Sequence, residues 1–122
     1  MVPDGPAIDL EQLETACMGL PALRSSLLHT FLGDVSSRLE RLTHAFETGD
    51  PRRVEFEAHG LKGMCATIGA GGCTMLFGEI EEWARDERLE DARAVLQPAI
   101  DEVHRTEQFI RRLDSIIARD AA

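Results

Sequence analysis

The stretch PALRSSLLHTFLGDVSSRLERLTHAFET, residues 21–48, decides the fold class of this chain. Its apolar side chains recur every three or four residues and form one continuous stripe, which is the pattern of an α-helix with one buried face. Pro21 suits the first turn, where its missing N–H would be unpaired anyway, and Gly49 is a typical residue at which a helix ends. We therefore expect one long helix over residues 21–48. Its stripe consists of Leu23, Leu27, Phe31, Val35, Leu39, Leu42 and Phe46.

A short helix is predicted upstream of this stretch. Asp9 is a typical N-cap, and the helix is expected to run from there to about residue 18, before Gly19. Residues 1–7, which contain two prolines and a glycine, form a loose lead-in. The expected buried side of the short helix is Leu10, Leu13 and Cys17.

A third helix is predicted directly after the long one. The pair Asp50-Pro51 combines a capping carboxylate with a first-turn proline, so a helix begins there and is expected to end at Gly69. Its apolar positions again have helical spacing. They are Val54, Ala58, Leu61, Cys65 and Ile68.

Two more helices are predicted after a glycine-rich turn at residues 69–72. One spans about residues 73–86 and the other about residues 89–118. Pro98 lies inside the last helix and is expected to kink it or divide it in two. The expected core positions of the first are Met75, Leu76, Phe77, Ile80, Trp83 and Ala84. Those of the second are Leu89, Ala92, Leu96, Ile100, Val103, Ile110, Leu113 and Ile117.

These elements predict an all-α protein. Four amphipathic helices joined by short connections indicate an antiparallel up-down four-helix bundle, and the short N-terminal helix is expected to cap one end. The sequence contains no sustained apolar–polar alternation, so no strand is predicted. At 122 residues, the chain is expected to be a single domain over residues 1–122.

The composition lowers the expectation for several function classes. The formal net charge is −9, which repels phosphate backbones and anionic lipid, so neither nucleic-acid nor membrane binding is expected. No apolar run approaches the ~18 residues that span a bilayer, and no basic segment followed by an apolar one begins the chain. The three cysteines lack metal-binding spacing and indicate reduced thiols in the cytoplasm. Met1 and the loose lead-in favour a free-standing chain.

The helix that begins at Pro51 carries a histidine on its outward face. At about 100° per residue, its five apolar positions fall within roughly 40° of one direction, and His59 lies roughly 140° away. Glycine in mid-helix costs about 0.5–1 kcal/mol relative to alanine, yet Gly63 lies one turn after His59. The other residues on this outward face are Arg52, Glu55, Phe56, Lys62 and Ala66.

We interpret this face as the surroundings of a reactive histidine, His59, which another protein must approach closely. Gly63 removes a side chain that would obstruct the approach, and Phe56 and Ala66 offer apolar surface for docking. Lys62 can place an ammonium near an anionic phosphoryl group on the imidazole. On spacing alone, a surface histidine beside a chance glycine is an equal alternative.

The surrounding motif resembles a known family. The run Ala58-His59-Gly60-Leu61-Lys62-Gly63, followed by Ile68-Gly69-Ala70, resembles the signature of the histidine phosphotransfer (HPt) domains of bacterial phosphorelays. The long helix and the pattern Leu76, Glu79, Ile80, Glu81 and Ala84 are also similar to that family. Gly60 and Met64 depart from it, because a polar and a small residue are more usual there.

The resemblance implies a phosphocarrier rather than an enzyme. His59 would accept the phosphoryl group, Lys62 would steady it and Gly63 would give the partner clearance, with Phe56, Ala66, Glu55 and Arg52 in the docking surface. The implied partners are receiver domains of response regulators or hybrid histidine kinases. The divalent cation that assists the transfer would lie on the receiver domain, so no metal or cofactor is expected on this chain. The chain is expected to be a monomer. A hydrogen bond from the His59 ring to Glu55 would orient its tautomer.

Two other classes of function stay open from the residues. The first is a bundle that binds or sequesters a signalling partner without phosphorylation. The second is an enzyme or metal protein, which ranks last because a di-metal bundle needs two Glu-x-x-His pairs and the nearest approach is Asp101 before His104. The acidic residues 79–87 are interpreted as a solvated face. His29 is expected to be partly buried and hydrogen-bonded, and His44 and His104 to be ordinary.

Overall fold

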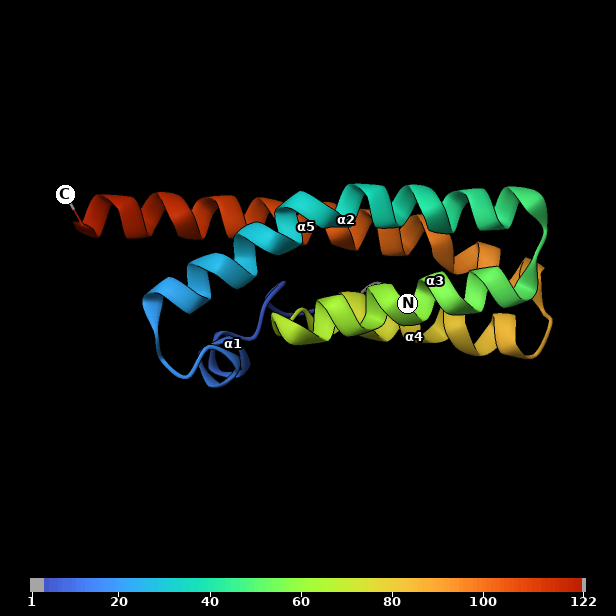
Figure 1. The fold of residues 1–122 in the computed structure, drawn as a ribbon, viewed down its shortest axis with the longest axis horizontal. Coiled ribbons are helices and arrows are strands. Elements are labelled where there is room, and N and C mark those ends of the chain that lie inside the picture. The colour runs from blue at the N-terminus through green and yellow to red at the C-terminus, as the bar shows by residue number, and fades with distance from the viewer. Residues whose placement is uncertain (1–3, 122) are drawn as a thin grey trace.

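The computed structural model describes residues 4–121, and the side chains of residues 4–115. Its helices are α1 (Leu10–Ala16), α2 (Pro21–Thr48), α3 (Pro51–Thr67), α4 (Gly71–Arg85) and α5 (Leu89–Ala121). Helices α2 to α5 form an elongated up-and-down bundle, and α1 lies across one end of it (Figure 1). The predicted all-α bundle with a short extra N-terminal helix is therefore confirmed.

The predicted end of α2 and the predicted start of α3 are confirmed by their caps. Gly49 ends α2 in the left-handed conformation, with φ of 70°, and its amide donates to the carbonyls of Ala45 and Phe46. The Asp50 carboxylate then accepts hydrogen bonds from the amides of Arg52 and Arg53, at 3.1 and 3.2 Å. These bonds satisfy first-turn amides that have no partner within the helix. The cap therefore fixes where the helix that carries His59 begins.

The turn between α3 and α4 is shorter than predicted. Three residues, Ile68, Gly69 and Ala70, lie outside the helices, because α3 ends at Thr67 and α4 begins at Gly71 rather than near Cys73. Gly69 has φ of 77°, and a Cβ there would lie 2.8 Å from the Asp9 carbonyl oxygen, so glycine is required at this position. The Asp9 amide donates to the Gly69 carbonyl at 2.9 Å. This bond joins α1 to the turn and holds it at the end of the bundle.

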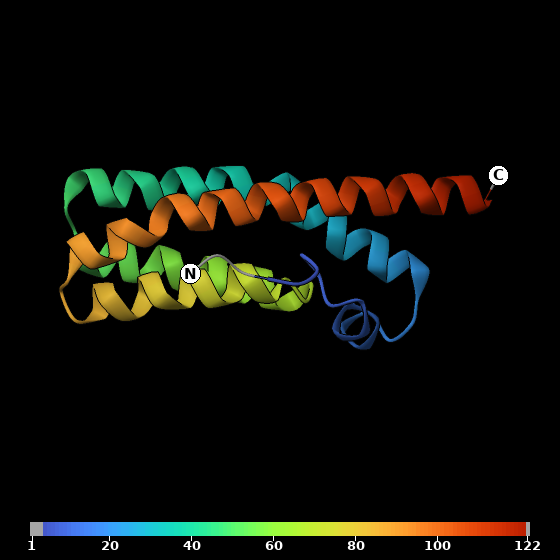
Figure 2. The ribbon, with the colours of Figure 1, turned by 180° about the vertical axis from the view of Figure 1, so that it is seen from behind.

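Of the two outcomes predicted for Pro98, a kink or a division of the last helix, the division does not occur, because α5 is continuous with Pro98 inside it. Figure 2 shows that the first turns of α5 lie at an angle to its long straight remainder. The buried residues Ala92 and Ala99 anchor the helix on both sides of the proline. This packing keeps α5 continuous at Pro98, although the proline has no N–H to donate the helical hydrogen bond there.

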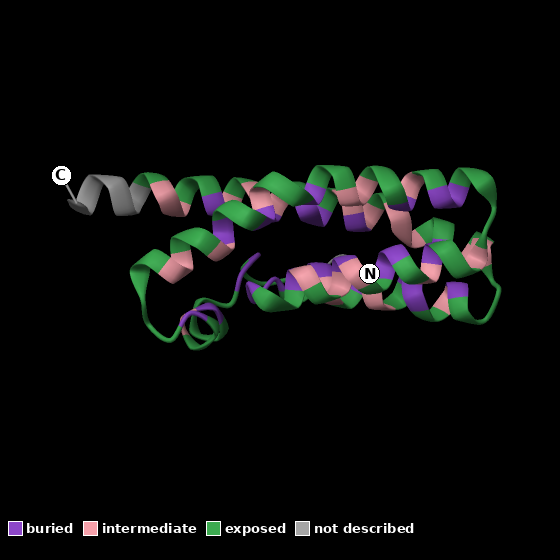
Figure 3. Ribbon diagram, viewed as in Figure 1, coloured by how far each residue is buried: buried purple, intermediate pink, exposed green. Residues whose placement is uncertain are grey.

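The core lies between the four long helices, where Figure 3 shows the buried positions facing inward. All five predicted apolar positions of α3 are buried, and so are Phe31, Val35, Leu42 and Phe46 of α2. Leu10 and Met75 were wrongly predicted to be buried, because they are 48% and 41% exposed. Leu10 lies in the first turn of α1 beyond the end of the bundle, and Met75 lies beside the buried stripe of α4. Trp83 is half-buried against the core, and the side chain of Ile117 lies outside the described residues.

Within residues 4–121, no helix combines the length and the apolar character needed to cross a membrane.

Candidate functional site

The imidazole of His59 projects from the middle of α3 into solvent. Its side chain is 71% exposed, whereas Ala58 and Leu61 on the opposite face of the helix are fully buried. The apolar spacing of α3 therefore places the ring outward, as the sequence predicted.

A buried carboxylate of α4 holds one side of this ring. The Nδ1 atom of His59 lies 3.1 Å and 3.0 Å from the two carboxylate oxygens of Glu81. The Glu81 side chain is only 4% exposed. The expected hydrogen bond from His59 to Glu55 was therefore wrong, because Glu55 accepts instead from Nε of Arg85 at 3.0 Å. The interpretation of residues 79–87 as a solvated acidic face was wrong for Glu81.

Two cations share the same carboxylate. The Nζ atom of Lys62 donates to Oε1 of Glu81 at 3.1 Å, and Nη2 of Arg85 donates to the same oxygen at 3.2 Å. The stem of Lys62 passes over Gly78 of α4, where a Cβ would lie 3.5 Å from its Cδ atom. The Lys62 side chain stays 36% exposed, so its ammonium can still meet a group that arrives from solvent.

The ionisation of Glu81 follows from these contacts. Burial works to raise the pKa of this carboxyl, but hydrogen bonds from His59 and Lys62, together with the charge of Lys62, lower it below its usual value. An ionised carboxylate can only accept hydrogen bonds, so Nδ1 of a neutral His59 ring carries the hydrogen. The lone pair is then on Nε2, on the side of the ring away from Glu81. The site thus presents an oriented nucleophilic nitrogen to solvent.

The other residues predicted for this face are also at the surface. Nothing lies within 4 Å of the place where a Cβ on Gly63 would be, so the face is open one turn after His59. Phe56 is 63% exposed, with the guanidinium of Arg53 5.8 Å from its ring centre. Arg52 and Ala66 are exposed as well, so all of these groups are available to an approaching protein.

The glycine at position 60 has a local structural reason. A Cβ there would lie 2.6 Å from Nη1 of Arg38, whose guanidinium crosses α3 at this point. Met64 is half-buried and packs against the core. Both departures from the usual motif are therefore accommodated beside the His59 face.

The remaining histidines have different surroundings. His29 is hydrogen-bonded as predicted, to Asp114 at 2.9 Å and Ser25 at 3.3 Å, but its 58% exposed side chain contradicts the predicted partial burial. It stays at the surface because its partners, Ser25 and Asp114, lie at the bundle surface. His44 and His104 are exposed. Within the part of the chain that the structure describes, no three His, Cys, Asp or Glu side chains are arranged to hold a metal ion.

Comparisons with known proteins agree with this geometry. The family model described as the Hpt domain matches residues 26–118, which is more than half of the chain. The crystal structure of histidine-containing phosphotransfer protein B (HptB) from Pseudomonas aeruginosa PAO1 is similar, with a TM-score of 0.83 and 27% sequence identity. The alignment covers 89% of this chain and 95% of that chain. A search of curated proteins gave no match.

The family match confirms the resemblance seen in the sequence around His59. It also makes the chain a non-enzymatic phosphocarrier rather than an enzyme. This chain belongs to the Hpt domain family and is a histidine phosphotransfer protein of phosphorelay signalling.

Proposed function

We propose that His59 is the phosphoacceptor of this protein and that Nε2 is the atom that carries the phosphoryl group. The observation that supports this assignment most strongly is the pairing of Nδ1 with the buried Glu81 carboxylate, while the ring is 71% exposed. The pairing leaves the Nε2 lone pair directed toward solvent, where a partner can present a phosphoryl group.

The transfer step uses an aspartyl phosphate on the partner. Nε2 attacks the phosphorus in line, the new N–P bond forms, and the bond from phosphorus to the aspartate oxygen breaks. The partner's carboxylate leaves with the bonding electron pair. The imidazole becomes positively charged as the bond forms, and the Glu81 carboxylate stabilises this charge through the hydrogen on Nδ1. The reverse step returns the phosphoryl group to the aspartate of another receiver.

Lys62 has the role of steadying the phosphoryl group. Its ammonium has three hydrogens and uses one of them on Glu81 at 3.1 Å, so two remain for phosphoryl oxygens beside His59. Gly63 leaves room for the partner, and Phe56, Ala66, Glu55 and Arg52 form the docking surface around it.

The partner supplies the remaining chemistry. The donor set at this site is one imidazole and one carboxylate beside the cations of Lys62 and Arg85, and these positive charges oppose binding of a divalent cation here. The cation would therefore lie in the acidic pocket of a receiver domain, belonging to a response regulator or a hybrid histidine kinase. We further propose a cytoplasmic monomer that acts as a single domain and, with a net charge of −9, binds no nucleic acid.

Transfer from a receiver domain charged with radiolabelled phosphate tests the assignment. The chain is expected to gain label that is acid-labile and alkali-stable, and His59→Gln is expected to gain none. His104→Gln is the matched control because His104 is also exposed, and it should be labelled normally. Label on His59→Gln would refute the assignment. A folded wild-type chain that gains no label from several receivers or kinases would favour the interaction module instead.

A further inference from the structure

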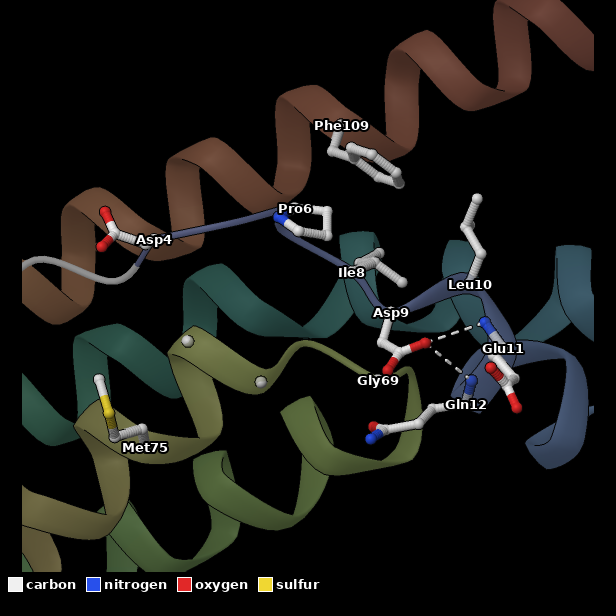
Figure 4. Close-up of a pocket in the computed structure, with 12 residues that line it drawn as sticks. Asp4, Pro6, Ile8, Asp9, Leu10, Glu11, Gln12, Gly69, Met75 and Phe109 are labelled. Atoms are coloured by element: carbon white, nitrogen blue, oxygen red, sulfur yellow. Dashed lines mark hydrogen bonds between the residues drawn. The ribbon is translucent and has the colours of Figure 1, made fainter.

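A groove of about 900 Å³ lies where the lead-in, α1, α4 and α5 meet. Figure 4 shows side chains from all four segments around it. None of the residues that line it belongs to the network of His59, Lys62, Glu81 and Arg85. Gly69 at the edge of the groove follows His59 by ten residues, which corresponds to about 15 Å along a helix. The groove is therefore a separate feature of the surface.

The walls of the groove are apolar. Leu10 of α1 and Met75 of α4 are two of the large apolar side chains that the fold leaves exposed, at 48% and 41%. Phe109 of α5 is half-buried beside them, and Ile8 is buried. Single exposed apolar residues are common, but three that come from three helices and line one hollow form a patch of the kind that binds a partner.

The floor of the groove allows a close approach. Gly71 and Gly72 of α4 line it, and neither has a side chain. The space where a Cβ on Gly71 would lie is empty to 4 Å. The backbone of another chain can therefore lie against the first turn of α4.

The charge of the groove has one sign. Asp4, Asp9 and Glu11 line it, and no lysine or arginine among the described side chains does. The Asp9 carboxylate is fixed by the amides of Glu11 and Gln12, at 3.0 and 3.2 Å. Within the described residues, neither Asp4 nor Glu11 forms an ion pair within 4 Å. The charge of Asp4 does act on the nearby guanidinium of Arg105, but that guanidinium is already paired with Glu102 at 2.8 Å. The Glu11 carboxylate, and in part that of Asp4, can therefore meet a cationic group from outside.

We propose that this groove is a docking site for a short amphipathic segment of a partner protein, in which lysine or arginine residues accompany leucine-like side chains. The apolar side chains of the segment would cover Leu10, Met75 and Phe109, and its cations would meet Asp4 and Glu11. A second copy of this chain is disfavoured because each copy has a net charge of −9, and the same charge disfavours anionic membranes. This inference does not depend on the role of His59.

The test uses the full, unphosphorylated chain and a synthetic amphipathic peptide of leucine and lysine. A peptide with glutamate in place of every lysine is its charge-reversed control. In a titration followed by amide NMR shifts, the leucine–lysine peptide is expected to shift the amides of Leu10, Gly71 and Gly72. By calorimetry, the glutamate peptide should bind at least about tenfold more weakly.

Two double variants separate the apolar and charged contributions. Leu10→Ser with Met75→Ser is expected to lower the affinity for the leucine–lysine peptide about tenfold, because both positions lose buried apolar contact. Asp4→Asn with Glu11→Gln is expected to lower the affinity for the same peptide and to make that affinity less dependent on salt concentration. All four residues are exposed, so the variants should remain folded, and circular dichroism melting checks this.

Matched variants elsewhere on the surface serve as controls. Met18→Ser with Leu20→Ser removes two other exposed apolar side chains, and Asp34→Asn with Glu40→Gln removes two other exposed charges. Both controls, and His59→Gln, should bind the peptide as the wild type does. Any of four results would overturn the proposal. They are an equal loss of peptide affinity in a groove variant and its control, amide shifts centred on His59, equal binding of the two peptides, and no binding of the leucine–lysine peptide at all. Equally tight binding of a small alkylammonium ion would replace the partner protein by a small molecule and would also overturn it.

Discussion

Replacing Glu81 with leucine removes the group that orients the His59 ring while keeping a side chain of similar size. Glu81 accepts hydrogen bonds from Nδ1 of His59, Nζ of Lys62 and Nη2 of Arg85. In Glu81→Leu the Nδ1 hydrogen has no acceptor, so nothing selects the tautomer with the lone pair on Nε2. We expect the transfer of phosphoryl groups to the chain to slow down.

The structure sets the size of the effect. A hydrogen bond to a charged group contributes about 1.5–3 kcal/mol, which corresponds to roughly ten- to a hundredfold in rate. The His59 side chain is 71% exposed, so water screens the bond and places the loss near tenfold. Lys62 and Arg85 are 36% and 57% exposed and can be solvated by water, so the fold should survive.

The assay is quench-flow transfer from a phosphorylated receiver domain, combined with ¹⁵N NMR of the imidazole nitrogens. Glu81→Leu is expected to show a lower rate and a larger share of the tautomer with hydrogen on Nε2. Glu79→Leu is the matched control, because Glu79 is an exposed carboxylate of the same helix outside the site. An unchanged rate in Glu81→Leu would refute the reasoning, and so would a lower rate with an unchanged tautomer population.

Four further predictions concern stability and access. Gly63→Ala should stabilise the fold by about 0.5–1 kcal/mol in urea unfolding, because its Cβ meets open space, whereas Gly60→Ala should gain less because Arg38 must move. Gly63→Leu should fold equally well but slow phosphotransfer, and an unchanged rate would remove the access role of Gly63. Asp50→Ala should cost about 1 kcal/mol in the same assay through loss of the α3 cap. Although burial opposes it, the pKa of the Glu81 carboxyl is lowered in the folded protein, so the stability that its ionised form contributes is complete above about pH 4.5 and is lost at lower pH. Between pH 7 and pH 3 the wild type should therefore lose more unfolding free energy than Glu81→Leu. Equal losses in the two proteins would contradict this.

The fold could be predicted from the sequence because strong local signals mark its helices. Pro21 and Gly49 delimit α2, and both predicted ends agree with the structure. The start of α4 was less predictable, because Gly71 and Gly72 have low helix propensity and resemble a turn. There, packing of the buried Cys73 and Leu76 outweighs the local preference.

The histidine face was predictable, but the group that orients the ring was not identified. Glu81 lies four residues after Phe77 and three before Ala84, so it belongs to the apolar face of α4. A carboxylate on such a face must be paired, and this spacing could have separated it from its exposed neighbours. Its partner His59 comes from another helix, and the relative position of α3 and α4 depends on packing that one helix does not reveal. Glu57 and Glu102 are likewise buried on apolar faces beside arginines.

The most direct test of the assignment is to identify the nitrogen that carries phosphorus. The chain would be labelled with ¹⁵N in its histidine rings, phosphorylated by a receiver domain and studied by ³¹P–¹⁵N correlation NMR. The structure predicts one coupled nitrogen, Nε2 of His59, with Nδ1 still carrying its hydrogen toward Glu81. Phosphorus on Nδ1 of His59, or on any other histidine, would contradict the proposed mechanism.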